Sequence, residues 1–175
     1  MNAATKDRPA THAGKAPVTR PTDKSALRIA RILVPVDFSE ECKPAIRYAT
    51  RLAEKFGATI HLAHVIESLG QLKDAEVVPW NAKMEDASMA LTRKLGELAN
   101  EEIEELVPVY PHVVEGQPYE QIVKLARAYL CDLIVISTHG RTGVSHALIG
   151  SVAERVVRHA ECPVLVVRAY ERDFA

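Results

Sequence analysis

Short apolar runs and longer apolar stripes alternate along this chain. The short runs are rich in Ile, Leu and Val, which is typical of strands buried on both faces of a parallel sheet. They predict five strands, at residues 29–36, 59–65, 107–115, 133–137 and 163–168.

The stripes between these runs repeat every three or four residues and predict amphipathic helices. The first helix has Pro44 in its first turn and ends at Gly57, two positions that suit these residue types. A second, long helix is expected over about residues 86–105. A third follows Pro118, and a fourth begins near residues 150–151. The expected apolar face of the long helix consists of Met89, Leu91, Leu95, Leu98, Ile103 and Leu106.

The alternation of strand and helix predicts an α/β fold, a parallel sheet with helices on both faces. The third strand contains Pro108 and Pro111, which cannot donate hydrogen bonds to a ladder, so we expect it at a sheet edge. Residues 68–85 lack a clear period and are expected to form a loop, either a plain connector or a lid. The order of elements predicts that the first and fourth strands lie side by side, with connections to opposite faces. Ligands of open α/β sheets bind at such a point, outside the carboxyl ends of the strands.

Composition narrows the classes of function. The 175 residues suffice for one domain, and the net charge of −1 gives no electrostatic reason to bind nucleic acid. No apolar run approaches the roughly 20 residues that span a bilayer, and no signal peptide is visible. Three cysteines, Cys42, Cys131 and Cys162, are typical of a reducing compartment without a disulfide framework. We therefore expect a cytoplasmic protein.

Residues 1–28 differ from the rest of the chain. They hold three prolines and no apolar periodicity, and their six basic and two acidic residues give +4, which leaves −5 for the remainder. This composition predicts a disordered tail in front of a single domain at residues 29–175. A targeting segment or an anion contact are the alternatives, and no motif supports either.

The stretch from residue 133 to 151 is the main candidate for binding chemistry. A buried strand is followed by a loop with Gly140 and Gly143 and then by a helix. Glycine allows a backbone to approach an anion closely, and a helix N-terminus offers unbonded N–H groups, so the order predicts a phosphate cradle. The alternative is that these glycines only shape a tight turn. Asp37 follows the first strand at the same edge of the sheet and is a second candidate, with helix capping as its alternative role.

Signals for catalysis or metal binding are weak. The chain has no G-x-x-x-x-G-K-[ST] loop, and Gly143-Val-Ser145 lacks the second glycine of a G-x-S-x-G elbow. His139, His146 and Arg141 lie near the cradle but are expected to face solvent. His61 and His64 are three residues apart in a strand, so they point to opposite faces and cannot share a metal. We assign no catalytic or metal-binding residue.

Four segments, in order, resemble the universal stress protein family. The family carries glycine, two residues, glycine, nine residues, glycine and then Ser or Thr. Here Gly140, Gly150 and Ser151 match this pattern, and Ser137 replaces the first glycine. The segments V-A-E-R-V-V-R-H-A-E-C-P-V-L-V-V-R, I-L-V-P-V-D-F-S and H-V are also similar to the family. The resemblance covers about residues 29–168.

The resemblance implies a Rossmann-like, adenine nucleotide alpha hydrolase-like fold with strand order 3-2-1-4-5. It also implies ATP binding, with Mg²⁺ or Mn²⁺ on the phosphates. The backbone near Val65 would pair with adenine, Asp37 would contact the nucleoside, and the glycine loop with the following helix would hold ribose and phosphates. The implied site residues are Pro35, Val36, Asp37, Val65, Ile136, Ser137, Thr138, Gly140, Gly150, Ser151, Val152 and Ala153. Two positions depart from the family: Ser137 adds a side chain, and Ala153 replaces a threonine of some members.

We therefore interpret the chain as a nucleotide-responsive stress or regulatory module rather than an enzyme. The alternatives are a slow ATP hydrolase and a nucleotide-free interaction protein. The last strand would lie at a sheet edge without a charge, bulge or central proline to protect it. Relatives commonly dimerise through this strand, so we expect a homodimer built on residues 164–167, and no membrane or nucleic-acid partner.

Overall fold

The computed structural model describes residues 27–67, 82–138 and 150–168. Within these ranges, five strands alternate with four α-helices and one short 3₁₀ helix, η1. The elements in chain order are β1 (Arg31–Pro35), η1 (Glu40–Cys42), α1 (Lys43–Phe56), β2 (Thr59–Ile66), α2 (Ala82–Glu102), β3 (Val109–Glu115), α3 (Pro118–Ala128), β4 (Leu133–Ser137), α4 (Ser151–His159) and β5 (Val164–Val167).

The five strands form one sheet in the order β3-β2-β1-β4-β5. Every neighbouring pair is parallel, and Ile32 of β1 lies opposite Leu133 of β4. The predicted α/β class, the parallel sheet and the strand order are confirmed. The proline-containing strand β3 lies at one edge, as expected, and β5 lies at the other.

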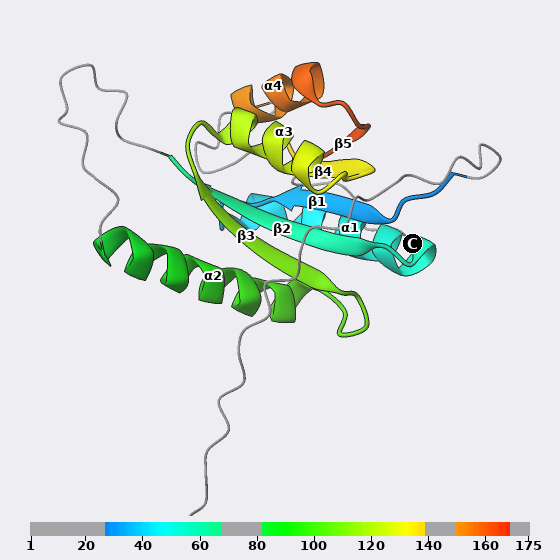
Figure 1. Cartoon of the computed structure of the whole chain (residues 1–175). Coiled ribbons are helices and arrows are strands. Elements are labelled where there is room, and N and C mark those ends of the chain that lie inside the picture. Colours follow the sequence, from blue (N-terminus) through cyan, green and yellow to red (C-terminus); the bar gives the residue numbers. More distant parts are fainter. Residues whose placement is uncertain (1–26, 68–81, 139–149, 169–175) are drawn as a thin grey trace, which may run out of the picture.

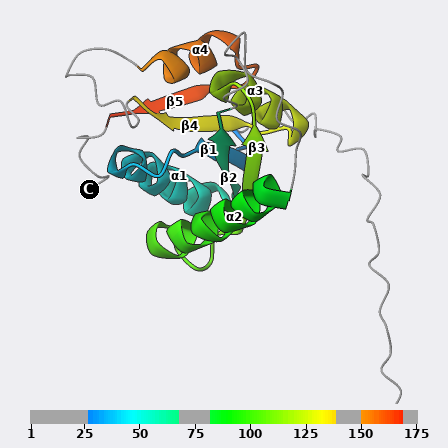
Figure 2. The same cartoon turned by 90° about the vertical axis from the view of Figure 1, so that its left-hand side faces the viewer.

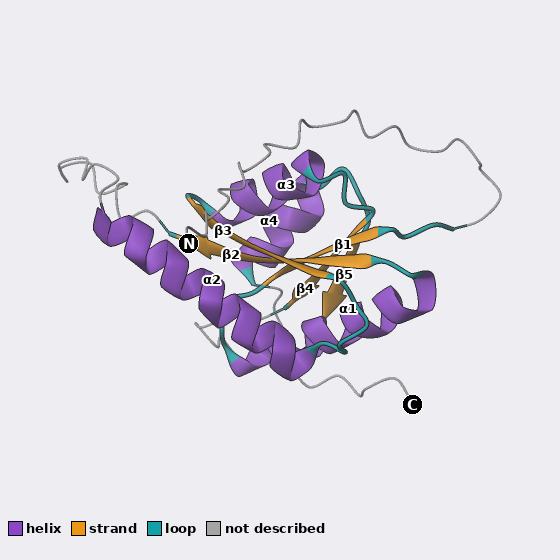
Figure 3. Cartoon of the chain, turned by 60° about the horizontal axis from the view of Figure 1, so that its bottom comes forward, coloured by secondary structure: helices purple, strands orange, loops and turns teal. Residues whose placement is uncertain are grey.

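Helices cover both faces of the sheet. Figure 2 shows α3 and α4 on one face and α1 and α2 on the other, and Figures 1 and 3 agree. Neighbouring residues of β1 serve different cores: Ile32 and Val34 pack with α1 and α2, whereas Leu33 packs with α3 and α4. Because each strand faces a core on both sides, its sequence is an almost unbroken apolar run.

The helix ends follow the predicted stop and start signals. Gly57 ends α1 in a left-handed conformation with φ 65°, and its N–H donates to the carbonyl of Ala53. Glycine adopts this conformation without strain, which explains the stop. Pro118 is the first residue of α3, where a missing N–H costs nothing.

The second helix differs from its prediction. It spans Ala82–Glu102 rather than about 86–105, and two of its expected core residues are wrong. Met89 is 64% exposed because it lies one residue off the buried stripe of α2, which runs through Ser88, Leu91, Leu95 and Leu98. Leu106 is 95% exposed because it lies in the turn after the helix. Leu95, Leu98 and Ile103 are buried as expected.

Three predictions fall outside the described residues: most of the tail at 1–28, most of the loop at 68–85, and Gly140 with its neighbours. Within the described part of the chain, no helix combines the length and apolar character that a membrane crossing requires.

Candidate functional site

The chain leaves β1 and β4 toward opposite faces of the sheet. After β1 it enters α1 on one face, and after β4 it reaches α4 on the other (Figure 2). The two strands are neighbours, so the predicted switch point is confirmed. Continued by three residues, the register Ile32–Leu133 places Pro35 beside Ile136 at the carboxyl edge.

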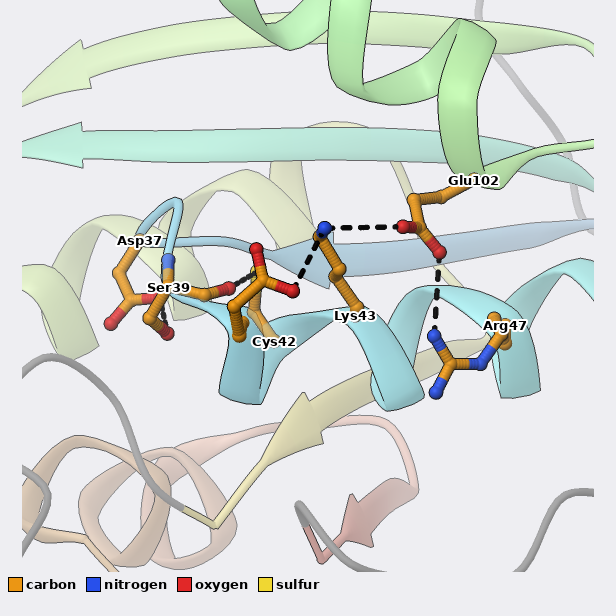
Figure 4. A network of polar contacts seen from close by, with 7 residues as sticks. Asp37, Ser39, Cys42, Lys43, Arg47 and Glu102 are labelled. Atoms are coloured by element: carbon orange, nitrogen blue, oxygen red, sulfur yellow. Dashed lines mark hydrogen bonds and ion pairs between the residues drawn. The ribbon is translucent and has the colours of Figure 1, made fainter.

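Asp37 forms a tight turn directly after β1. Its Oδ1 accepts hydrogen bonds from the Ser39 backbone N–H, with N···O 3.1 Å, and from the Ser39 hydroxyl, with O···O 2.6 Å (Figure 4). This is an Asx turn, in which a side chain closes the backbone bend. The N-cap residues of η1 and α1 are Ser39 and Cys42, and neither makes a side-chain cap. Helix capping stays the alternative role of Asp37.

Phe38 is held in an unusual backbone conformation next to Asp37. Its φ is 63°, in the left-handed region that costs a residue other than glycine about 1–3 kcal/mol. The His64 ring lies 4.5 Å from the Phe38 ring between centroids, and the Lys94 ammonium lies 4.3 Å from the same ring centroid. Packing from β2 and α2 therefore stabilises the strained turn.

His64 also ties this turn to β2. Its Nδ1 lies 2.9 Å from the carbonyl oxygen of Val36, which assigns the proton to Nδ1. The Val36 N–H donates to the carbonyl of Ala63 at 2.8 Å. Sequence reasoning assigned no role to His64 or Phe38, and the H-V pair was the one signal that pointed toward β2 at this place.

The two ends of the loop between β4 and α4 meet at Thr138 and Gly150. The Thr138 N–H donates to the Val167 carbonyl at 2.8 Å, and the Gly150 N–H donates to the Thr138 carbonyl at 2.7 Å. A Cβ at position 150 would lie 2.8 Å from the Thr138 oxygen, closer than such atoms approach. Glycine is therefore required here because the two backbones touch.

Helix α4 begins at this contact. Gly150 is its N-cap residue without a side-chain cap, and Ser151 is exposed at the first helical position. The first N–H groups of a helix have no partner within the helix, so they are available to an anion. Val152 is half-buried, and Ala153, 3% exposed, packs into the core beneath α4.

The structure brings most of the predicted site residues to one edge of the sheet. Residues 35–37 end or follow β1, residues 136–138 end or follow β4, and residues 150–153 precede or begin α4. Val65 lies opposite Asp37 when the β1–β2 register is continued by two residues. Gly140 is the member of the set that lies outside the described residues.

Two titratable groups that follow Asp37 in the described chain, Cys42 and Lys43, are not poised for nucleophilic chemistry. Burial, followed by the Asp37 carboxylate, raises the pKa of the Cys42 thiol to about 11, so this thiol stays neutral. A hydrogen bond to Glu40, at 2.9 Å between Nζ and the carboxylate, raises the pKa of Lys43. Lys43 also lies 3.6 Å from Glu102, which in turn contacts Arg47 at 3.4 Å (Figure 4). This network joins α1 to α2 and engages the ammonium with carboxylates.

The two strand histidines point to opposite faces, as predicted. His61 packs against Tyr129, which follows α3, whereas His64 packs against Phe38 in the core of α1 and α2. The Nδ1 of His61 lies 2.9 Å from Nε2 of His112. Burial, then His112 and Arg31, lower the pKa of His61 to about 4, which keeps the ring neutral.

Comparison with known proteins agrees with this geometry. The universal stress protein family model matches residues 28–168. Universal stress protein MJ0531 of Methanocaldococcus jannaschii is 31% identical over 152 residues, which cover 82% of this chain and 84% of that protein. The solved structure of MJ0577 is 29% identical with a TM-score of 0.58, and the match covers 85% of this chain and 100% of that one.

Two further solved structures are described as nucleotide complexes. One is a universal stress protein in complex with cAMP, with 21% identity, a TM-score of 0.60 and coverage of 82% and 99%. The other is the universal stress protein from Archaeoglobus fulgidus in complex with dAMP, with 21% identity, a TM-score of 0.51 and coverage of 80% and 98%. At 21% identity, the similarity to these two structures establishes a shared fold. The family match over most of the chain and the agreement with MJ0531 establish more: the chain belongs to the universal stress protein family.

Proposed function

We propose that this chain binds ATP, with Mg²⁺ or Mn²⁺ on its phosphates, in the crevice at the carboxyl ends of β1 and β4. The observation that carries the proposal is the contact between Gly150 and Thr138. It holds the start of α4 against the end of β4, across from the Asp37 turn. A helix N-terminus and a carboxylate turn then face one crevice from neighbouring strands, which is where open α/β sheets bind ligands.

Each part of the nucleotide has a matching group in this proposal. Adenine needs an apolar slot with backbone partners, which Pro35, Val36 and the backbone near Val65 provide. Asp37 contacts the nucleoside. Ribose and phosphates lie against residues 136–140 and 150–153, where backbone N–H groups and the Ser151 hydroxyl are suited to anions.

The ligands of two similar solved structures support an adenine nucleotide as the ligand of this chain. The two described complexes hold cAMP and dAMP, which share the adenine base. ATP is our choice because the chain retains Gly150, Ser151 and Gly140 of the family pattern, which the triphosphate would contact. Ser137 adds one hydroxyl at the position where the family pattern has its first glycine.

We further propose that binding, rather than hydrolysis, is the function. Lys43 is the ammonium that follows the Asp37 turn, and Glu40 and Glu102 already engage it. Cys42 is neutral and buried. Nucleotide occupancy would then set the state of a regulatory module in the cytoplasm, and the module would act as a homodimer through β5.

Isothermal titration calorimetry with ATP and Mg²⁺ tests this proposal. The parent chain should bind one ATP, and Gly140→Val should abolish binding because a branched side chain enters the phosphate path. Gly96→Val is the matched control, since position 96 lies on α2 with open space around it. Circular dichroism checks that both variants fold. Equal ATP affinity of Gly140→Val and the parent would show that the cradle is assigned wrongly.

Asp37→Asn tests the nucleoside end of the crevice separately. Asparagine retains the Oδ1 that accepts both Ser39 hydrogen bonds, so the turn should persist while the charge is lost. We expect ATP affinity to fall about tenfold, which corresponds to roughly 1.4 kcal/mol. Unchanged affinity would remove Asp37 from the site.

A further inference from the structure

Three elements meet at the side chain of Phe38, which directly follows Asp37. Phe38 lies between β1 and η1, and its ring packs against the core on the α1–α2 face of the sheet. The His64 ring of β2 lies 4.5 Å from the Phe38 ring between centroids, and the Lys94 ammonium of α2 lies 4.3 Å from the Phe38 centroid. The ring therefore links the end of β1 to two elements that are distant in the sequence.

Phe38 is also the middle residue of the turn that holds the Asp37 carboxylate. Before the turn, the Val36 N–H donates to a carbonyl of β2 at 2.8 Å, and the Val36 carbonyl oxygen lies 2.9 Å from Nδ1 of His64. After it, the Ser39 N–H and hydroxyl both donate to Oδ1 of Asp37 (Figure 4). The conformation of Phe38 therefore decides whether Ser39 reaches the carboxylate and holds it in one orientation.

The backbone of Phe38 is left-handed, with φ 63°. Residues that carry a side chain rarely adopt this conformation, so the contacts of the ring stabilise it here. Without them, the turn would populate several conformations, and a ligand that contacts the carboxylate would have to order it again. Apparent affinity then falls in proportion to the fraction of chains that hold the competent turn.

We propose that Phe38 and Lys94 are positioning residues that hold Asp37 ready for the nucleoside part of the nucleotide, so that α2 sets the affinity of the crevice. This inference rests on the proposed ATP site. Phe38 acts through Asp37, because its ring packs into the α1–α2 core, and Lys94 acts through the Phe38 ring. A preorganised contact raises affinity because binding then orders fewer groups. The phosphates are assigned to α4, so the effect is confined to the nucleoside.

The chain offers two matched controls. Leu130 is the other described residue besides glycine with a positive φ, 50°, but it precedes β4, at the end of the strands opposite the crevice. Leu130→Ala therefore alters the same kind of turn away from the ligand. Lys124 is an exposed lysine of α3, on the other face of the sheet from α2 (Figure 2). Lys124→Met removes the same charge as Lys94→Met at a distance from the Asp37 turn.

The test is calorimetry on the full-length protein well below its melting temperature, with ATP and Mg²⁺, adenosine, and inorganic tripolyphosphate as separate ligands. Phe38→Ala should bind ATP and adenosine about tenfold more weakly and tripolyphosphate as the parent does. Phe38→Tyr keeps the ring and should restore most of the lost affinity. Lys94→Met should weaken ATP and adenosine binding about two- to fivefold, as expected for the loss of an exposed cation–π contact. Both controls should match the parent.

The outcomes separate this inference from the nucleotide proposal. If the parent binds ATP and both Phe38→Ala and Lys94→Met bind it equally well, the positioning role is overturned and the site stands. Equal weakening toward ATP and tripolyphosphate also overturns it, because it shows a general distortion of the crevice. So does a Phe38→Tyr protein that binds as weakly as Phe38→Ala. If circular dichroism shows that Phe38→Ala does not fold, Lys94→Met decides alone. A parent that binds neither ATP nor adenosine overturns both proposals.

Discussion

Gly150 is the residue at which the geometry of the proposed cradle is most open to test. A methyl group there would meet the Thr138 carbonyl at 2.8 Å, and backbone cannot move aside as a flexible side chain can. We predict that Gly150→Ala lowers the free energy of unfolding by about 1–3 kcal/mol, as overpacking does. Thermal denaturation measures this, and weaker ATP binding should accompany it.

Gly96→Ala is the control for that substitution. Position 96 lies within α2, and nothing lies within 4 Å of a Cβ placed there. Alanine favours helix over glycine by up to about 1 kcal/mol, so this variant should be as stable as the parent or more stable. A Gly150→Ala protein as stable as Gly96→Ala would contradict the close approach.

His61 makes stability depend on pH. Its pKa is about 4 in the folded chain and 6.5 in the unfolded one, so the unfolded chain binds more protons between these values. The resulting loss in the free energy of unfolding is absent above pH 6.5, grows as the pH falls, and is complete below about pH 4. We predict a loss of roughly 2–3 kcal/mol over this range, measured by urea unfolding at a series of pH values.

His61→Phe should flatten that pH dependence, because phenylalanine fills the same space without titrating. The exposed His159 supplies the control, and His159→Gln should keep the slope of the parent. An unchanged slope in His61→Phe would show that another group carries the effect. His112, whose pKa burial also lowers, is the next candidate.

Residue roles in the crevice were only partly predictable from the sequence. Asp37 stood out because it follows a buried strand at the expected ligand edge of the sheet, and Gly150 because it matches the family's glycine pattern. Phe38 carried no such signal, since its φ of 63° depends on packing from His64 and Lys94, which are distant in the chain. Tertiary contacts of this kind leave no periodic trace.

At the scale of elements, β5 is one of the two edge strands of the described sheet, and β3 is the other. β5 has four residues, it lies at the sheet margin, and Val164, Leu165 and Val166 are half-buried. Such an edge is a template for pairing, and a two-fold axis would pair two copies antiparallel. We predict a homodimer in which each β5 covers the other.

Val166→Lys should put a charge into that contact and yield monomer or aggregate. Leu106→Lys is the matched control: Leu106 is 95% exposed and precedes β3, at the other edge of the sheet. Light scattering at micromolar concentration compares the two variants with the parent. A monomeric parent would exclude the β5 dimer.

Elements were more predictable than their ends. The strand β4 and the stop of α1 at Gly57 match their predictions because an apolar run and a glycine act locally. The long helix α2 was misplaced by several residues, and Met89 and Leu106 were assigned to its core. Met89 lies one residue off the buried stripe and Leu106 follows the helix, and the approximate period of the apolar residues did not separate them from the core positions.

At the scale of the whole molecule, the composition of the first residues predicts that they add little to the core. Among the described residues, Ile29 is the first that packs against either apolar cluster. We predict that deletion of residues 1–27 changes the melting temperature by no more than about a degree, because a segment without apolar periodicity buries little surface. A fall of several degrees would show that the tail docks on the domain.

The central claim is that the crevice holds ATP, and the most direct measurement is of what the protein carries after purification. The full-length protein is denatured, and the released small molecules are identified and quantified by mass spectrometry, with Gly140→Val purified in parallel. The account predicts ATP close to one molecule per parent chain and none with the variant. ADP in place of ATP would favour the slow hydrolase. No adenine nucleotide from the parent, together with no heat of binding when ATP and Mg²⁺ are added, would contradict the account.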